Sequence, residues 1–208
     1  MEVTSINLGR PVELHGRSYS GTTGIFKDPV ESARVDVEGL AGDAICDTRH
    51  HGGPDQALYL YRLEDQDFWS AELGRPIAPG TFGDNLTVRG LPEPGLPIGA
   101  RLHFPDLVLE VTAPRIPCNT LAERMGDPGF ARAFIRAERP GIYLRVIETG
   151  RVRLGDRFRL ECPDPDAGTT VDLYRDSFRK LNEAEMRRWL ELPIDQRTRQ
   201  GFETRLGA

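Results

Sequence analysis

Short hydrophobic segments alternate with turns rich in glycine and proline over residues 1–165. The clearest alternation lies at residues 107–112, where Leu107, Leu109 and Val111 fall on one face of an extended chain. Further strands are predicted at residues 33–37, 56–61, 86–88, 142–147, 152–154 and 157–162. So many short strands at close spacing favour a barrel or a sandwich. The pattern therefore predicts a mainly β fold.

Two helical regions are expected between these strands. Residues 64–73 have a helical composition and are followed by a glycine. Residues 119–134 place hydrophobic side chains at helical spacing, and Asp127 with the following proline offers a cap inside this region. We expect Asn119 or Thr120 to cap its first turn.

The pattern changes after a proline- and aspartate-rich linker at residues 163–168. Beyond it, hydrophobic residues recur at helical spacing, Asn182 is followed three residues later by a glutamate, and Asp195 can open a last helix. We therefore predict a barrel-type domain over residues 1–163 and a small three-helix extension over residues 164–208. A unit of this size is marginal alone and should pack on the main domain or on a partner.

Composition and charge narrow the class of protein. The net charge is −5, which disfavours a general nucleic-acid binder. No hydrophobic run approaches the roughly 18 residues of a membrane helix, and the N-terminus lacks the features of a signal peptide. Cys46, Cys118 and Cys162 are odd in number and have no paired spacing. We expect a cytoplasmic protein in a reducing compartment, without nucleic-acid or membrane partners.

Residues 113–121 carry the most informative motif, Ala-Pro-Arg-Ile-Pro-Cys-Asn-Thr-Leu. Each proline favours extended backbone before it, so Cys118 ends a stiff segment. A thiol near a helix N-terminus, with Arg115 three residues upstream, has two reasons for a lowered pKa. Its thiolate would suit a soft metal or attack an electrophile. The alternative is a buried cysteine that acts as a small hydrophobic residue.

A second motif combines two histidines with two glycines at His50, His51, Gly52 and Gly53. Imidazole donors beside backbone that can approach a ligand closely are typical of an anion site. Cys46 with the histidines also suggests zinc, but a fourth ligand is missing. A polar turn without a ligand is the third interpretation.

Two further segments add polar candidates. Gly83, Asn85 and Thr87 supply backbone, amide and hydroxyl groups in a glycine-rich turn that lacks the arrangement of a nucleotide-binding loop. Arg145 lies in an otherwise hydrophobic strand, where it needs an anion. That anion is an internal carboxylate or a bound phosphate, and physical chemistry alone slightly favours the carboxylate.

These motifs occur together in one order along the chain. The matching pieces are Gly-Asp at 42–43, His-Gly-Gly at 51–53 with Asp55, Ala-Leu-Tyr-Leu-Tyr at 57–61, Phe-Gly-Asp-Asn-Leu-Thr at 82–87, Pro-Arg-Ile-Pro-Cys at 114–118, Tyr-Leu-Arg-Val at 143–146 and Gly-Asp at 155–156. In this combination the chain resembles the MOSC family, the domain related to the C-terminal part of molybdenum cofactor sulfurases. Its closer resemblance is to the stand-alone, YiiM-like bacterial branch, which also carries a three-helix extension.

The resemblance implies a MOSC-type β-barrel and a molybdenum–pterin cofactor (molybdopterin). Cys118 falls on the position of the molybdenum ligand. The implied cofactor-binding residues are Arg115, Asn119, Arg145, His50, His51, Gly52, Gly53, Gly83, Asn85 and Thr87. Asn119, Ile142 and Asp84 depart from residues common in the family, and the first two affect the identity of the substrate more than cofactor binding.

The resemblance further implies an oxidoreductase that reduces N-hydroxylated compounds such as hydroxylaminopurine bases, amidoximes or hydroxamates. Because no flavin or iron–sulfur motif occurs in the chain, electrons would come from a separate flavin or iron–sulfur protein. Two alternatives stay open. One is a sulfur-transfer protein with a Cys118 persulfide, and the other is a non-catalytic carrier of the cofactor. A zinc hydrolase is a more distant alternative.

Overall fold

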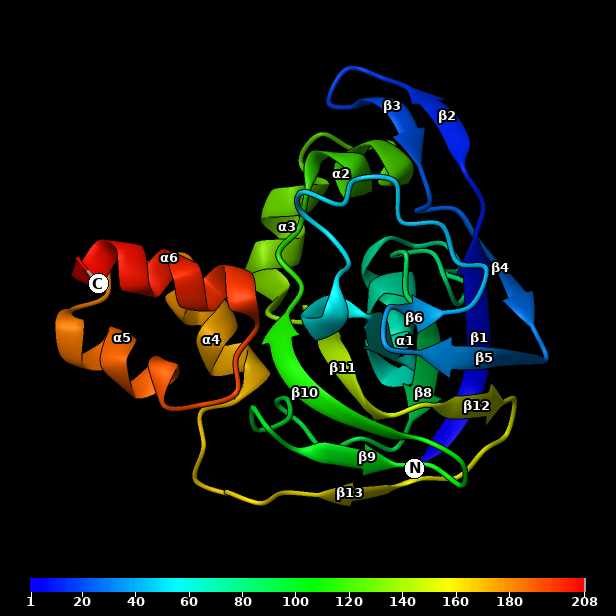
Figure 1. Ribbon diagram of the computed structural model, residues 1–208. Helices are drawn as coiled ribbons and strands as arrows, with labels where there is room; N and C mark the ends of the chain where they lie inside the picture. Colours follow the sequence, from blue (N-terminus) through cyan, green and yellow to red (C-terminus); the bar gives the residue numbers. More distant parts are fainter. Residues whose placement is uncertain (208) are drawn as a thin grey trace.

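A mixed sheet of eight strands forms the centre of the computed structural model, which describes residues 1–207 (Figure 1). Its strand order is β13-β9-β10-β11-β7-β8-β1-β4, and only β7 and β8 run parallel. A three-stranded sheet (β12-β5-β6) and a two-stranded hairpin (β2-β3) complete the β structure. The strands are β1 (Glu2–Gly9), β2 (Val12–His15), β3 (Ser20–Thr23), β4 (Lys27–Val30), β5 (Ser32–Asp36), β6 (Gly39–Leu40), β7 (Leu58–Arg62), β8 (Leu86–Arg89), β9 (Arg101–His103), β10 (Val108–Pro114), β11 (Ile142–Glu148), β12 (Gly150–Arg153) and β13 (Arg159–Glu161).

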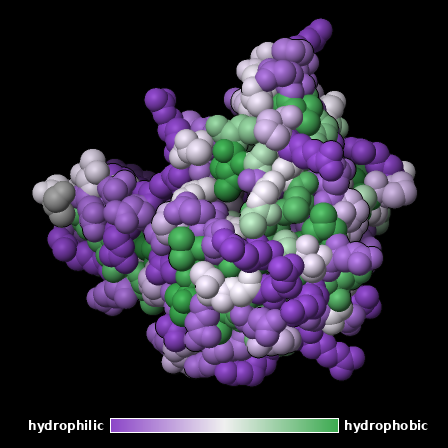
Figure 2. Space-filling view, turned by 45° about the vertical axis from the view of Figure 1, so that its right-hand side comes forward, coloured by the Kyte–Doolittle hydropathy of each residue, from purple (hydrophilic) through white to green (hydrophobic). Residues whose placement is uncertain are grey.

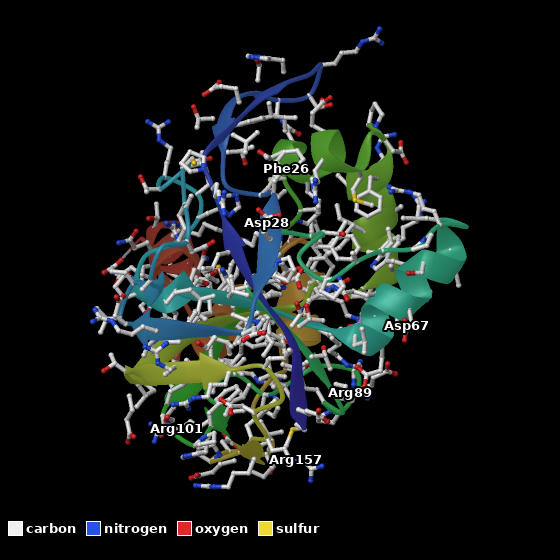
Figure 3. The ribbon with its side chains drawn as sticks, turned by 90° about the vertical axis from the view of Figure 1, so that its right-hand side faces the viewer. Phe26, Asp28, Asp67, Arg89, Arg101 and Arg157 are labelled. Atoms are coloured by element: carbon white, nitrogen blue, oxygen red, sulfur yellow. The ribbon has the colours of Figure 1, made fainter. Side chains whose placement is uncertain are left out.

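The predicted mainly β, barrel-like fold is confirmed in its β content, and among the described residues the large sheet is curved but not closed into a barrel. The edge strands β13 and β4 do not pair with each other. The sheet curls far enough that an isolated bridge joins Glu2 to Arg157, and Phe158 N–H donates to the Met1 carbonyl at 3.2 Å. Figure 3 shows Arg157 beside the lower end of β1. The sheet therefore curves towards closure without a continuous ladder.

The first thirty residues contain four strands that the hydrophobic pattern did not predict. In β1 the inward positions include Ser5 and Asn7, which are 7% and 0% exposed, so polar residues hide the alternation. In β4 a proline occupies position 29, which a strand tolerates at the edge of a sheet. These strands are thus held by tertiary pairing more than by local sequence.

The predicted helices are confirmed, with shifted ends. They are α1 (Leu63–Glu72), α2 (Asn119–Met125), α3 (Phe130–Ala137), α4 (Thr170–Asp176), α5 (Glu183–Leu190) and α6 (Gln196–Leu206), with a short 3-10 turn η1 (Pro54–Gln56). Asp127 does not cap α3, which begins after Gly129. In residues 1–207 no helix has the length and hydrophobicity to cross a membrane.

Two hydrophobic clusters share β10, whose seven residues are all buried. Leu109 and Val111 belong to the larger cluster inside the curved sheet. Ala113 belongs to an aromatic cluster between the sheet and helices α1, α2 and α3, in which the Trp69 and Phe134 rings stack at 5.7 Å. Because both faces are packed, the end of β10 is held firmly where the chain turns towards α2.

The C-terminal helices form a layer against β10 at one side of the molecule (Figure 1). Their outer surface is largely hydrophilic, at the left of Figure 2. Capping boxes at Thr169 and Asn182 start α4 and α5, and Asp195 caps α6, as the sequence predicts for the last two. The predicted domain boundary at 163/164 falls in the linker, although Leu173 and Trp189 pack into the larger cluster of the sheet.

Candidate functional site

A cavity opens near the β2–β3 hairpin, between the ends of the central strands and the start of α2. Figure 2 shows hydrophobic side chains gathered on the face below the hairpin, with hydrophilic residues around them. A concave site with a mainly hydrophobic lining and a few polar side chains is typical of small-molecule and cofactor sites. The residues that carry its chemistry are Cys118, Arg115, His51, Tyr59, Tyr143 and Lys27.

Cys118 is the N-cap residue of α2, with extended backbone (φ −120°, ψ 169°). Its carbonyl accepts hydrogen bonds from Leu121 and Ala122 N–H at 3.1 and 3.3 Å. The expectation that Asn119 or Thr120 caps the helix is therefore wrong: the helix begins at Asn119, since proline 117 keeps the preceding chain extended. The thiol consequently lies at the positive end of the helix dipole.

The Cys118 thiol is a thiolate at neutral pH. Burial alone would raise its pKa, but a hydrogen bond from His51 and the positive charge of Arg115 outweigh burial and lower the pKa to about 6. Arg115 Nη2 lies 3.7 Å from Sγ. The sequence predicted the arginine and the helix terminus as causes, whereas the contribution of His51 emerges only from the fold.

Among residues 1–207, Arg115 is a buried cation without a carboxylate partner. It is 6% exposed and lies over the Tyr59 ring, with the guanidinium carbon 4.9 Å from the ring centroid. Burial would lower its pKa, but Tyr143, Cys118 and Tyr59 raise it, so the charge persists. Its Nε has no hydrogen-bond partner among residues 1–207. A buried, charged donor in this state is suited to an anionic ligand.

The loop before η1 brings His51 to the thiol. Its Nδ1 lies 3.2 Å from the hydroxyl of Tyr143 on β11, and His51, Tyr143 and Cys118 all line the cavity. Gly52 and Gly53 both have positive φ, at 71° and 82°, which glycine adopts without strain. A Cβ at Gly52 would lie 2.9 Å from Ile45 Cδ1, so this position also requires a small residue. Of these residues, His51 and Gly52 line the cavity.

The lining of the cavity also contains a buried ion pair that sequence reasoning missed. Lys27 Nζ lies 2.6 Å from Asp43 Oδ1, and the two side chains are 6% and 5% exposed. Asn85 Nδ2 donates to Asp43 Oδ2 at 2.8 Å. Burial lowers the pKa of Lys27, and Asp43 opposes this effect. Two sequence signals were available: Lys27 is one of only two lysines in the chain, and Asp43 lies in a segment that matches the family.

Asn85 and Gly83 line the cavity, but Thr87 does not. Thr87 is fully buried and donates a 2.7 Å hydrogen bond to Asp84 Oδ2, which also accepts from Gly80 N–H at 3.1 Å. Asp84 therefore organises the glycine-rich loop from behind, and Thr87 belongs to that support.

Three other predicted site residues lie outside the cavity. His50 is exposed and contacts Asp47 at 2.9 Å, Gly53 lies beyond the lining, and Asn119 is exposed on α2. The structure separates the two histidines because neighbouring residues of the loop point in different directions. Within residues 1–207, no three His, Cys, Asp or Glu side chains are grouped to hold a metal, so the zinc alternative has no ligand set.

Arg145 is also outside the cavity. Its Nη2 lies 2.9 Å from Asp55 Oδ1 and its Nη1 lies 3.3 Å from Glu110 Oε1. It donates further to the carbonyls of Pro193 and Ile194 at 3.3 and 3.5 Å. The geometry therefore supports the internal carboxylate partner rather than a phosphate. The Arg145 side chain does not line the cavity, so it is not placed to bind a phosphate there.

Cys46 lies at the cavity mouth and is unlike Cys118. It is exposed, and partial burial together with the negative charges of Asp43 and Glu13 raises the pKa of its thiol. Cys162 follows β13 and is free. Of the three thiols, Cys118 alone combines cavity position with a lowered pKa in the described chain.

Comparisons with known proteins place this geometry in a family. The family model of the MOSC domain matches residues 47–159. The chain is 38% identical over 159 residues to the uncharacterized protein YflK of Bacillus subtilis, covering 76% of this chain and 72% of YflK. It is 31% identical over 148 residues to protein YiiM of Escherichia coli, covering 64% of this chain and 66% of YiiM.

A more distant relative is a reductase of Gibberella moniliformis, 33% identical over 134 residues; the match covers 61% of this chain and 23% of that protein. Among solved structures, YiiM of Geobacillus stearothermophilus superimposes with a TM-score of 0.80 at 27% identity, covering 98% of this chain and 97% of that one. The similarity thus includes the C-terminal helices. This chain belongs to the MOSC domain family.

Proposed function

We propose that this chain binds a molybdenum–pterin cofactor in the Cys118 cavity and reduces N-hydroxylated compounds. The MOSC family is associated with the molybdenum cofactor, and one relative carries the name reductase. The observation that supports the proposal most directly is the pair formed by a thiolate, Cys118, and a buried arginine without a carboxylate, Arg115.

The donor set of the cavity fits such a group. Thiolate sulfur is a soft ligand that suits molybdenum in a sulfur-rich environment. Cys118 would hold the metal, with its thiolate oriented by His51 and Arg115. A single protein ligand is sufficient here, because the pterin itself supplies sulfur donors.

The phosphate of the pterin would need donors, and Arg115 is the main candidate. Its Nε is free to donate, and its positive charge has no acidic partner in the described chain. Gly52 and Gly83 line the cavity at positive φ, and both lie close to hydrophobic side chains that a Cβ would press against. The backbone at these two points can therefore approach a ligand closely.

When bound, the cofactor would supply two-electron redox chemistry. Reduction of R–NHOH breaks the N–O bond and gives R–NH2 and water, with the uptake of two electrons and two protons. A separate flavin or iron–sulfur protein would provide the electrons. The chain would hold the cofactor through Cys118 and Arg115 and shelter the reacting group inside the cavity, while Tyr59 and Tyr143 limit the access of water.

A sulfur-transfer role is the second candidate, since a thiol with a pKa of about 6 also suits a persulfide. Arg115 lowers the pKa of Cys118 and would serve a persulfide as well. The association of the MOSC family with the molybdenum cofactor favours cofactor binding. A non-catalytic carrier would share the same binding site and differ only in turnover.

Metal content tests the proposal. We expect molybdenum near one equivalent in protein from a host that makes the cofactor and none in protein from a host that does not. Cys118→Ser should lose the molybdenum and all N-reductase activity with an artificial reductant, because the soft ligand is gone. Cys46→Ser is the matched control, as it changes a thiol at the same cavity.

Absence of molybdenum from wild-type protein of both hosts would overturn cofactor binding. If the protein contained molybdenum but did not reduce N-hydroxylated substrates, the non-catalytic carrier role would replace the reductase role. Equal damage by Cys46→Ser in a folded protein would require a second ligand at the cavity.

A further inference from the structure

Arg197 in the first turn of α6 binds the loop that carries His51. Its guanidinium donates to four consecutive or nearly consecutive backbone carbonyls: Nη2 to Thr48 and His51, both at 3.2 Å, Nε to Arg49 at 3.2 Å, and Nη1 to Gly52 at 2.9 Å. Four of the five N–H groups of one side chain thus fix a single loop. This arginine lies outside the segment that matches the family model, which ends at residue 159.

The same turn of α6 also holds the residues that follow the loop. Gln196 N–H donates to Asp55 Oδ2 at 2.9 Å, and Gln56 Nε2 donates to Asp195 Oδ1 at 3.2 Å. Asp195 is 1% exposed and accepts from the N–H groups of Arg197 and Thr198 as the cap of the helix. The start of α6 is therefore a rigid base for the loop.

Apart from the contact of His51 with Tyr143 and the contacts of Asp55 with Arg145 and Thr112 at its end, the loop is held by few bonds. The histidine 51 N–H donates to Asp47 and Gln56 N–H to Gly53, both at 3.0 Å and both within the loop region itself. Two consecutive glycines with positive φ make its backbone permissive of many conformations. Without an external anchor, such a segment would sample several positions of His51.

We propose that Arg197 is a positioning residue for the Cys118 cavity. It holds the backbone of the loop so that the His51 side chain lies 3.2 Å from the Tyr143 hydroxyl and lines the same cavity as Cys118. The C-terminal helices thereby complete the site through one side chain rather than merely covering the sheet. The inference deepens the proposed function and rests on it for the role of His51 beside a cofactor ligand.

Arginine is required at this position because of its shape. A planar guanidinium presents several donors in a fixed fork, whereas the ammonium of lysine is a compact charge that cannot reach four carbonyls at once. Arg197→Lys should therefore keep the positive charge but should not hold the loop in its position.

Arg199 supplies a matched control on the same helix. Its guanidinium also donates to two carbonyls, those of Leu190 and Leu192 at 3.0 and 2.7 Å, but both belong to the C-terminal extension itself. Arg199→Gln should loosen the connection of α5 and α6 and leave the loop unchanged. General destabilisation of the extension is thus separated from the loss of the loop anchor.

The experiment uses full-length, cofactor-free protein and two measurements. Hydrogen exchange of a peptide spanning residues 43–56 should become about tenfold faster or more in Arg197→Gln, because several charge-assisted hydrogen bonds are lost. The chain has four histidines, so ring-nitrogen NMR signals can be assigned, and those of His51 should move in Arg197→Gln and Arg197→Lys. Arg199→Gln should change neither measurement.

Unchanged exchange and unchanged His51 signals in Arg197→Gln would overturn the inference. Equal changes in Arg199→Gln would do the same, since the effect would then be general. Molybdenum content, measured in parallel on protein from a cofactor-producing host, should fall in Arg197→Gln more than in Arg199→Gln. If wild-type protein carries no molybdenum, the proposed function fails, and the exchange and NMR data on cofactor-free protein still decide the role of Arg197.

Discussion

Strands β10 and β11 are neighbours in the sheet. Arg115 follows the last residue of β10 and Arg145 lies in the middle of β11, but their side chains have different surroundings. Arg145 contacts Asp55 and Glu110 and two backbone carbonyls, and it joins the sheet to the segment that leads into α6. Arg115 lies 3.7 Å from the Cys118 sulfur and over the Tyr59 ring, and no carboxylate among residues 1–207 pairs with it. The Nε atoms of both arginines have no hydrogen-bond partner among these residues, so the carboxylates make the difference.

The difference separates an arginine that holds the protein together from one that is suited to a ligand. A cation with carboxylate partners is neutralised within the fold, so the loss of Arg145 leaves Asp55 without this counter-charge and Glu110 with Arg101 alone. A buried cation without an acid keeps its attraction for an anion from outside. The chemistry of the side chain is the same in both places, and only the partners differ.

The largest expected effect is on stability. Arg145→Gln should destabilise the cofactor-free protein by about 3 kcal/mol, at the lower end for a broken buried pair because the Arg145 side chain is 24% exposed. For a chain of this length that corresponds to a melting temperature lower by roughly 6–12 °C. Thermal unfolding followed by circular dichroism measures the shift.

Arg101→Gln is the matched control for this prediction. Arg101 contacts the same acid, Glu110, at 3.1 Å, but its side chain is 42% exposed, so its loss should cost less than about 1 kcal/mol. If Arg145→Gln melted within 1 °C of wild type, the contrast between the two buried arginines would be lost.

The second effect is on ligand retention. Arg115→Gln removes a charge-assisted contact worth about 1.5–3 kcal/mol, so cofactor affinity should fall roughly ten- to a hundredfold. Its cofactor-free form should melt much closer to wild type than that of Arg145→Gln, because no acid loses its partner. Molybdenum content after extensive dialysis, together with thermal unfolding of the cofactor-free protein, tests both halves. The two variants should show opposite patterns; full retention of molybdenum in Arg115→Gln would contradict its phosphate role.

The smallest effect is on the thiol at the cavity. In cofactor-free protein, alkylation of Cys118 by iodoacetamide should accelerate as pH rises through about 6, since only the thiolate reacts. Cys46, whose pKa is raised from 9.0, should require alkaline pH. Peptide mass spectrometry resolves the two sites across a pH series.

The same measurement compares the arginines. Arg115→Gln should move the Cys118 profile to higher pH, because its positive charge lowers the pKa of the thiol. Arg145→Gln should leave the profile in place, as Arg145 is outside the cavity. If both variants moved the pH profile of Cys118 alkylation, Arg145 and the cavity would be electrostatically coupled.

Local patterns were sufficient for the elements whose hydrophobic residues recur at a clear period. Propensity, proline restriction and capping act over a few positions, so neighbouring residues were enough to predict several elements. These are the strands β10 and β11, the helix after Cys118 and the caps at Asn182 and Asp195. Strand β1 was missed since its inward positions include Ser5 and Asn7, polar residues that only a completed network can satisfy. Strands β2, β3 and β4 are largely exposed and show no hydrophobic alternation.

For the candidate site, the sequence by itself determined that Cys118 ends a stiff segment before a helix, with Arg115 close by. Only the tertiary structure decided which charges meet: it neutralised Arg145 with Asp55 and Glu110, left Arg115 without an acid, and placed Lys27 against Asp43. It also brought Arg197 to Gly52 across 145 positions of the chain. The physical reason is that proline stiffness and helix caps act between neighbours, whereas the partner of a buried charge is selected by the packing of distant segments.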